Sequence, residues 1–201
     1  MSGRTTRRRP AVQPVAIPES LAPAPLPPPA PALLYVPRTI LRDTHDAFLP
    51  YWRAGVETAA YWFGVATGHL AVATTVVLPR LDQSAGHYQV DVASLRRLVA
   101  NMRVQGLTNL AQVHTHPSAW VGHSAYDDAH AYSTRVGALS LVWPHYGRAY
   151  AYDLCGVGVH ERRDGQWVHL SAADVANRIR LIDSVADQRW DIVCGDGADG
   201  E

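Results

Sequence analysis

The sequence predicts a single α/β domain built on a mixed central β-sheet that is flanked by helices. Hydrophobic residues make up 47% of the 201 residues, which is enough for one globular core. Short apolar segments bounded by turn residues alternate with segments whose apolar residues recur at helical spacing. The expected order is strand, helix, two strands, helix, strand, then further strands and a last helix. Such alternation of strands and helices is typical of α/β domains.

Proline content separates this domain from the two ends of the chain. Residues 1–31 hold nine of the fourteen prolines and four early arginines. This Pro/Ala-rich basic leader cannot bury a core and is predicted to be disordered, serving as a tether or, alternatively, docking on a partner. The domain is predicted over residues 32–190. Residues 191–201 form a Gly- and Asp-rich acidic tail that is expected to be flexible.

The first predicted elements are a strand at 33–36 and a helix that follows it. Thr39 is expected to cap this helix, because a threonine side chain can accept a hydrogen bond from the first backbone N–H groups. Pro50 should end or kink the helix, because proline cannot continue the hydrogen-bond ladder. The apolar face is expected to contain Leu41, His45, Phe48 and Trp52.

The uncharged stretch 59–78 allows two interpretations, a membrane span or a hairpin of buried strands. We favour the hairpin, with strands at 56–65 and 69–78, because residues 64–69 indicate a turn and the many β-branched residues favour strands. The arginines near the N-terminus are not followed by an apolar region, so no secretory signal is expected.

Two further helices are predicted from their capping residues. Asp91 can cap the first of them, which should end near Gly106. Its apolar residues at helical spacing are Leu95, Leu98, Val99 and Met102. The last helix should begin after Ser171, which has the spacing of a capping box with Asp174. Its apolar residues are Val175, Ile179, Ile182 and Ala186. Between these helices the sequence predicts strands at 110–116, 138–143, 148–160 and 167–170, a turn at 144–147, and a loop that runs into a short helix over 122–130.

Charge and cysteine content argue against several classes of function. The formal net charge is zero, so neither nucleic acid nor an anionic membrane surface is an expected partner. The two cysteines, Cys155 and Cys194, form no C-x-x-C pair, which favours a reducing, cytoplasmic location and argues against a cysteine-bound zinc. All 18 basic residues are arginine. A GC-rich coding bias explains this composition, and avoidance of lysine in a protein that handles lysine-linked conjugates is the alternative.

The segment His114-Thr115-His116-Pro117 carries the main functional signal. Alternate side chains on a strand share a face, so His114 and His116 can bind one metal ion together, and Pro117 should end the strand. Asp127 follows eleven residues after His116 and can return a carboxylate to the same ion. Two imidazoles and one carboxylate leave a fourth position for water, which is typical of a catalytic zinc site rather than a structural one.

These residues resemble the JAMM motif of the JAB/MPN metalloprotease family. His114, His116 and Pro117 match its beginning, and Ser124 and Asp127 follow at the family's spacing. The resemblance implies the family's fold, a single domain with the layering of cytidine deaminases. It implies a zinc ion held by His114, His116 and Asp127, and an oxyanion that accepts a hydrogen bond from Ser124. The chain is more similar to the small bacterial members than to the eukaryotic ones, because it has little room for long insertions.

The resemblance also implies a glutamate on an upstream strand that acts as the general base. The chain has four glutamates, which are Glu19, Glu57, Glu161 and Glu201. Glu57 is the match, because it stands early in the predicted strand after the first helix and directly before an apolar run. Glu19 and Glu201 lie near the ends of the chain, and Glu161 follows the motif beside two arginines. A carboxylate beside so apolar a run needs a partner or a role.

The implied function is that of a zinc metallopeptidase, an isopeptidase or peptidase that cleaves after the C-terminus of a ubiquitin-like protein. A deubiquitinase-like enzyme of this kind would belong to a bacterial ubiquitin-like conjugation or antiviral system. Its expected partners are the ubiquitin-like protein or its conjugate, and the enzymes of the conjugation system. Trp120 and His123 are candidates for substrate binding. The alternatives are a peptidase that releases a sulphur-carrier protein in cysteine or cofactor synthesis, and a non-catalytic MPN scaffold.

Overall fold

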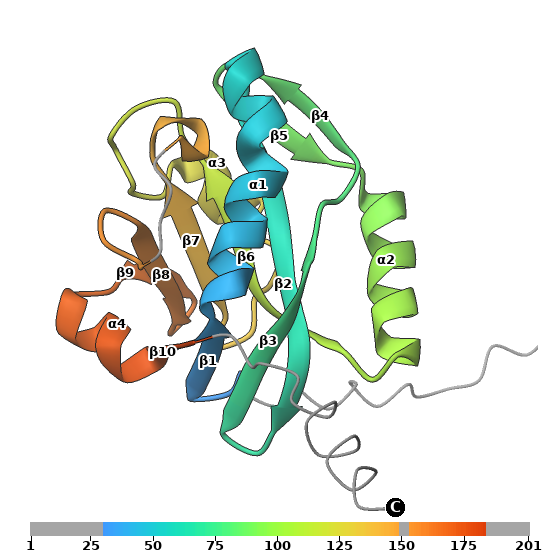
Figure 1. The fold of residues 1–201 in the computed structure, drawn as a ribbon, viewed down its shortest axis with the longest axis vertical. Coiled ribbons are helices and arrows are strands. Elements are labelled where there is room, and N and C mark those ends of the chain that lie inside the picture. The colour runs from blue at the N-terminus through green and yellow to red at the C-terminus, as the bar shows by residue number, and fades with distance from the viewer. Residues whose placement is uncertain (1–29, 149–152, 184–201) are drawn as a thin grey trace, which may run out of the picture.

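The structure is a computed structural model that describes residues 30–148 and 153–183. The predicted acidic tail and all but the last two residues of the predicted leader lie outside these ranges. Within them the chain forms a large sheet with helices packed around it (Figure 1). The boundaries that the sequence predicts for the leader, the domain and the tail stay predictions.

Eight strands form the main sheet. They are β1 (Leu33–Pro37), β2 (Ala59–Thr67), β3 (Leu70–Val77), β6 (Thr108–Thr115), β7 (Leu139–Trp143), β8 (Gly158–Arg163), β9 (Gln166–His169) and β10 (Ile179–Ile182). Their order across the sheet is β10-β1-β3-β2-β6-β7-β8-β9. Strand β1 runs parallel to β3 and β10, and β6 runs parallel to β7, whereas the other pairs are antiparallel. The prediction of a mixed central sheet is therefore confirmed.

The helices lie on both faces of this sheet. They are α1 (Arg38–Ala54), α2 (Val92–Val104), α3 (Ala125–Ala129), α4 (Ala172–Arg178) and the short 3₁₀ helix η1 (His145–Gly147). Helix α1 crosses the face that is nearer the viewer in Figure 1. Trp62 of β2 points towards it, and its indole N–H donates to the Thr44 hydroxyl at 2.9 Å. The neighbouring side chains Tyr61 and Phe63 point the other way, towards α2.

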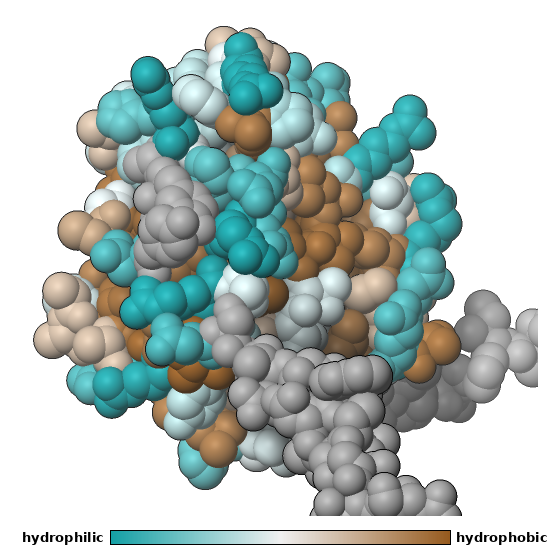
Figure 2. All heavy atoms as spheres, in the orientation of Figure 1, coloured by the Kyte–Doolittle hydropathy of each residue, from teal (hydrophilic) through white to brown (hydrophobic). Residues whose placement is uncertain are grey.

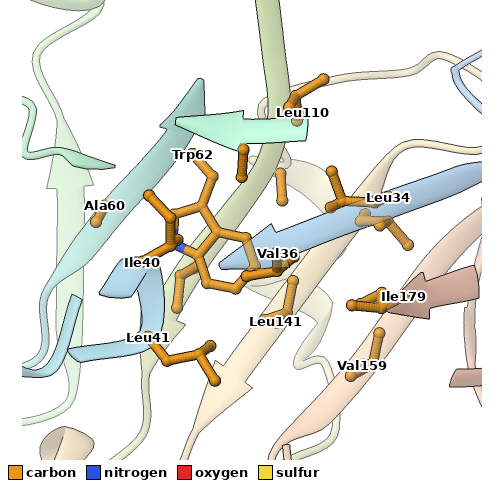
Figure 3. Close-up of a cluster of buried hydrophobic side chains, with 14 of the residues drawn as sticks. Leu34, Val36, Ile40, Leu41, Ala60, Trp62, Leu110, Leu141, Val159 and Ile179 are labelled. Atoms are coloured by element: carbon orange, nitrogen blue, oxygen red, sulfur yellow. The ribbon is translucent and has the colours of Figure 1, made fainter. Parts of the chain in front are cut away.

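The core between α1 and the sheet is built around Trp62. Figure 3 shows its ring surrounded by side chains from α1 and from several strands, including Ile40, Leu41 and Leu141. Trp62 and Leu41 are fully buried. Burial of an aliphatic side chain such as Leu41 contributes about 1.5–3 kcal/mol to stability. This packing fixes the strand pair β2 and β6, which positions the functional residues.

Helix α1 differs from its prediction at both ends. It begins at Arg38, with Pro37 as the N-cap and no side-chain cap, so the prediction that Thr39 caps it is wrong. Of the two outcomes predicted for Pro50, an end of the helix is wrong, because the helix continues to Ala54, and a kink stays a prediction. The buried face includes Thr44, which the sequence did not suggest. Its hydroxyl donates to the carbonyl of Ile40 at 2.6 Å and accepts from Trp62, so its burial leaves no polar group unsatisfied.

The stretch that allowed either a membrane span or a hairpin is the hairpin of β2 and β3. No helix within residues 30–148 and 153–183 is long and apolar enough to cross a membrane. The pairing shifts register between Phe63 and Gly64. At Gly64 a Cβ atom would lie 1.9 Å from the carbonyl oxygen of Val72, so only glycine fits this close approach of the two strands.

A second, two-stranded sheet was not predicted. It is a hairpin of β4 (Leu81–Ser84) and β5 (His87–Val90), joined through Ala85 and Gly86. The polar residues Asp82 and Gln83 interrupt apolar alternation in β4, and the alternation in β5 covers only four residues, so neither strand stands out in the sequence. Helix α2, which follows, begins after Asp91 as predicted, and the Asp91 carboxylate accepts from the N–H of Ala93 at 3.0 Å.

The predicted last helix is wrong in its second half. Helix α4 ends at Arg178, and Ile179 and Ile182 belong to β10 instead. Ile179 pairs with Leu34 of β1 and is 4% exposed. The open edge of β1 offers backbone hydrogen bonds to a β-branched segment, and these outweigh its helical spacing. The strand predicted over 148–160 is present only from Gly158, while its residues 149–152, like Ala186, lie outside the described residues.

Candidate metal centre

The two motif histidines stand at the end of the central strand β6. His114 is 1% exposed, and His116, the first residue after the strand, is 5% exposed. Backbone bonds hold both sides of this end, because Thr115 donates to the carbonyl of Thr58 at 3.0 Å and His116 donates to that of Trp143 at 2.9 Å. The side chains of His114 and His116 share a face, with ring centroids 5.1 Å apart, as the alternation of a strand predicts.

Asp127 reaches the histidines from the first turn of α3. Its Oδ1 lies 3.4 Å from Nε2 of His114, and its Oδ2 lies 3.4 Å from Nε2 of His116. One ligand atom from each of the three residues lies within 4.8 Å of the others. The sequence folds this way because Ser124 caps α3 in a capping box with Asp127. The structure thus brings together the three residues that the sequence predicts as ligands.

The unsatisfied ring of His114 fits a metal ion at this place. Both of its ring nitrogens are buried and have no hydrogen-bond partner among the described residues. A buried polar atom without a partner is costly, and a bound cation would satisfy Nε2. At His116 the Nδ1–H can donate to the carbonyl of Trp120 at 3.1 Å, so in the neutral ring the lone pair of Nε2 is available to a cation. Two imidazoles and a carboxylate are a donor set that suits divalent transition metals.

The protonation states of the ligands also suit a cation. Burial lowers the pKa of His114 to about 3, so its ring is neutral at neutral pH, as a ligand requires. Burial alone would raise the pKa of Asp127, but hydrogen bonds from His116 and Ser124 and the charge of His114 lower it overall. Burial alone would lower the pKa of His116, but its hydrogen bond with Asp127 raises it overall. In the absence of a cation, Asp127 and His116 therefore stabilise each other's charged forms.

Glu57 lies beside this group, in the short loop before β2 rather than within the strand. Its N–H donates to the carbonyl of Ser84 at 2.9 Å, and its carbonyl accepts from the side chain of Gln83 at 2.9 Å. The residue is 7% exposed. Burial raises the pKa of the Glu57 carboxyl to about 7, with an opposing effect of His116 and a smaller raising effect of Asp127. A carboxyl that titrates near neutral pH is suited to proton transfer.

A pocket of about 350 Å³ opens over these groups. Its lining residues are Glu57, Gly86, His87, Tyr88, His116, Pro117, Ser118, Trp120, Ser124, Tyr126 and Asp127. Several of them come from the β4–β5 hairpin, so the sequence did not suggest them. Tyr88 is the clearest case, since its ring lies 5.6 Å from that of His114 and its hydroxyl accepts from Gln112 at 2.7 Å. The alternation of polar and apolar residues around Tyr88 is a weak sequence signal for strand β5.

The hydroxyl of Ser124 is engaged with Asp127. It donates to Oδ2 of Asp127 at 2.7 Å and accepts from the backbone N–H of the same residue at 3.1 Å. The N–H of Ser124 donates to Oδ2 as well, at 2.7 Å. Ser124 therefore orients the carboxylate of Asp127. Its predicted hydrogen bond to an oxyanion stays a prediction, although its place in the pocket lining is compatible with that role.

Trp120 and His123, the two weaker candidates, occupy different environments. Trp120 is 54% exposed and stacks on His116, with ring centroids 5.0 Å apart and planes 12° apart, so it forms a wall of the pocket. His123 does not line the pocket. Its nitrogens lie 3.0 Å from the carboxylate of Asp128 and 3.0 Å from the hydroxyl of Ser140. These contacts fit a residue that secures the start of α3, and substrate binding by His123 stays a prediction.

The chain is similar in sequence to one curated protein and in structure to several solved proteins. No family model matches the chain. Over 117 residues it is 40% identical to the "Probable metalloprotease y4jG" of Sinorhizobium fredii (strain NBRC 101917 / NGR234), covering 56% of this chain and 72% of that protein.

Among solved structures, the solution structure of protein DSY2949 from Desulfitobacterium hafniense has a TM-score of 0.54 at 16% identity, over 76% of this chain and 95% of that one. The crystal structure of AF2198, a JAB1/MPN domain protein from Archaeoglobus fulgidus, has a TM-score of 0.43 at 16% identity, over 74% of this chain and 99% of that one.

Proposed function

Because the chain belongs to the JAB/MPN family of metalloprotease-like proteins, we propose that it is a zinc-dependent isopeptidase or peptidase that cleaves after the C-terminus of a ubiquitin-like protein. The observation that carries this proposal is the grouping of His114, His116 and Asp127 next to a pocket that Glu57, His116 and Asp127 line. The relative at 40% identity is itself named a probable metalloprotease, which supports the same reaction class.

The residues at the pocket have separate roles in peptide hydrolysis. His114, His116 and Asp127 would hold zinc, which when bound supplies Lewis-acid chemistry that makes water a nucleophile near neutral pH. Glu57, which is buried beside the proposed ligands and lines the pocket, accepts the proton of the attacking water and then passes it to the departing amine nitrogen. Ser124 holds Asp127 in place. Hydrolysis needs no nucleophilic side chain in this scheme.

The shape of the pocket supports a slender polypeptide as substrate. One part of its lining is the β4–β5 hairpin, whose turn contributes Gly86, and another part consists of Pro117 and Trp120. An extended tail of small residues can lie beside such a hairpin as an added strand, because a two-stranded sheet has unpaired edges. The glycine-rich C-terminus of a ubiquitin-like protein has this character.

The proposal is tested by measuring metal content and cleavage together. The full chain should contain about one zinc per molecule by elemental analysis and should cleave a ubiquitin-like protein that is joined through its C-terminus to a lysine amine or to a linear extension. Glu57→Ala and Asp127→Ala should each abolish cleavage while the far-ultraviolet circular dichroism stays unchanged. Asp46→Asn, an exposed carboxylate on α1, is the matched control and should retain full activity.

Two outcomes would contradict the proposal. Full activity of both Glu57→Ala and Asp127→Ala would remove these residues from the reaction. A wild-type protein that binds no metal and cleaves no such substrate would instead favour a non-catalytic scaffold.

A further inference from the structure

We propose that Tyr146 is a positioning residue that latches the β4–β5 hairpin to the metal-binding segment and thereby keeps Glu57 in place. The effect of Tyr146 on catalysis rests on the proposed function, whereas its contacts with the hairpin and the metal-binding segment do not. Tyr146 lies in η1, directly after β7, and is half-buried. It was not singled out by the sequence, because its contacts join segments that are far apart in the chain.

Tyr146 connects the two segments through its two ends. Its backbone N–H donates to the carbonyl of His116 at 2.7 Å. Its phenolic O–H donates to the carbonyl of Ala85, in the turn of the β4–β5 hairpin, at 2.8 Å. One residue therefore bridges a proposed metal ligand and the hairpin that forms the pocket wall.

The backbone at Tyr146 is held in an unfavourable conformation. Its φ angle is 58°, and that of His145 before it is 52°, in the left-handed region that residues with side chains rarely adopt. The turn is held there by the N–H of His145, which donates to the carbonyl of Ser118 at 3.0 Å, and by the N–H of Gly147, which donates to Pro144 at 2.9 Å. Such strain persists where the surrounding structure fixes it and is often found at functional sites.

The hairpin needs external attachments, because it is separate from the main sheet and a two-stranded hairpin alone is only marginally stable. Tyr88 attaches β5 through its hydrogen bond with Gln112. Tyr146 attaches the turn.

The hairpin in turn holds Glu57. The carbonyl of Ser84 accepts the Glu57 N–H, and the side chain of Gln83 donates to the Glu57 carbonyl. Movement of the turn at Ala85 would therefore move the neighbouring Ser84, whose carbonyl holds the backbone of Glu57.

The latch is tested by hydrogen exchange on the full chain. Tyr146→Phe removes only the hydroxyl, and Tyr146→Asn tolerates a positive φ but is too short to reach Ala85. In both variants the amides of residues 81–90 should exchange about two- to tenfold faster, the factor that one hydrogen bond of ordinary net strength represents. Tyr35→Phe, which removes a hydroxyl on β1 away from the pocket, is the matched control and should leave this segment unchanged.

A kinetic measurement separates positioning from general stabilisation. If Tyr146 positions Glu57, then kcat for the cleaved polypeptide should fall about two- to tenfold in Tyr146→Phe under conditions in which the variant stays folded, while KM and zinc content match those of Tyr35→Phe. Wild-type exchange of residues 81–90 in both Tyr146 variants would overturn the latch. An inactive wild-type protein would overturn the proposed function instead, and the exchange result would still decide the latch.

Discussion

Replacement of Glu57 by glutamine should make the metal-free protein more stable at pH 8 but not at pH 4.5. The Glu57 carboxyl is buried, and burial raises its pKa from 4.5 to about 7. Ionisation of this group is therefore less favourable in the folded protein than in the unfolded chain. Glutamine has nearly the same shape but cannot ionise, so it removes this unfavourable contribution.

The size of the effect follows from the pKa difference. Between pH 4.5 and pH 7 the folded state binds more protons at Glu57 than the unfolded state does, so the free energy of unfolding falls as the pH rises. The contribution of the protonated carboxyl is fully present below pH 4.5 and is lost as the pH passes 7. At about 1.36 kcal/mol per pKa unit, the rise from 4.5 to about 7 corresponds to about 3 kcal/mol.

The measurement is urea denaturation of metal-free wild type and Glu57→Gln at pH 4.5 and pH 8. The advantage of the variant should be about 3 kcal/mol larger at pH 8. Glu161→Gln is the control of opposite sign. Burial alone would raise the pKa of Glu161, but hydrogen bonds from Arg178 and Arg163 lower it overall, so this carboxylate stabilises the fold above its unfolded pKa. Glu161→Gln should therefore destabilise the protein at pH 8.

A comparison of the two pH values cancels any pH-independent effect of the glutamine amide. Equal pH dependence of wild type and Glu57→Gln would refute the reasoning, because it would mean that the Glu57 carboxyl titrates alike in both states. Zinc bound beside Glu57 should reduce the difference, because a nearby positive charge favours the ionised carboxylate.

Further outcomes are expected at other places in the structure. His123→Ala leaves the buried Ser140 hydroxyl without its partner and should lower the free energy of unfolding by about 1–3 kcal/mol; an unchanged urea midpoint would contradict this. Chelation of zinc should lower the Tm, since free zinc at 100 times its Kd stabilises by about 2.7 kcal/mol, and a Tm insensitive to chelator would oppose metal binding. Gly64→Ala should lower the free energy of unfolding by more than about 3 kcal/mol, because its Cβ meets the Val72 carbonyl. Gly86→Ala, with open space around it, should leave the free energy of unfolding nearly unchanged, and similar unfolding curves for the two variants would count against the close approach at Gly64.

Local sequence signals were sufficient where a residue's neighbours in the chain are also its neighbours in space. The Asp91 cap, the β2–β3 hairpin and the common face of His114 and His116 all follow from spacing along the chain. The same holds for Asp127, because the capping box with Ser124 turns α3 towards the strand.

Local sequence signals failed where contacts with a distant segment of the chain determine the structure. Residues Ile179–Ile182 have helical spacing after α4, yet they pair with β1, which lies more than 140 residues earlier. The burial of Thr44 depends on a hydrogen bond from Trp62. The role of Tyr146 depends on Ala85, which is 61 residues away. Spacing within a short window carries no information on such contacts.

Asp127 is subject to two independent demands. As the third residue of α3 it completes a capping box, and as a carboxylate facing two imidazoles it completes a donor set for a metal. Glutamate would satisfy the helix but is one methylene longer, and asparagine would keep the length but lose the charge. Among the common side chains, aspartate alone meets both requirements. A substitution of Asp127 that preserves the cap of α3 would therefore remove the metal ligand while the fold stays intact.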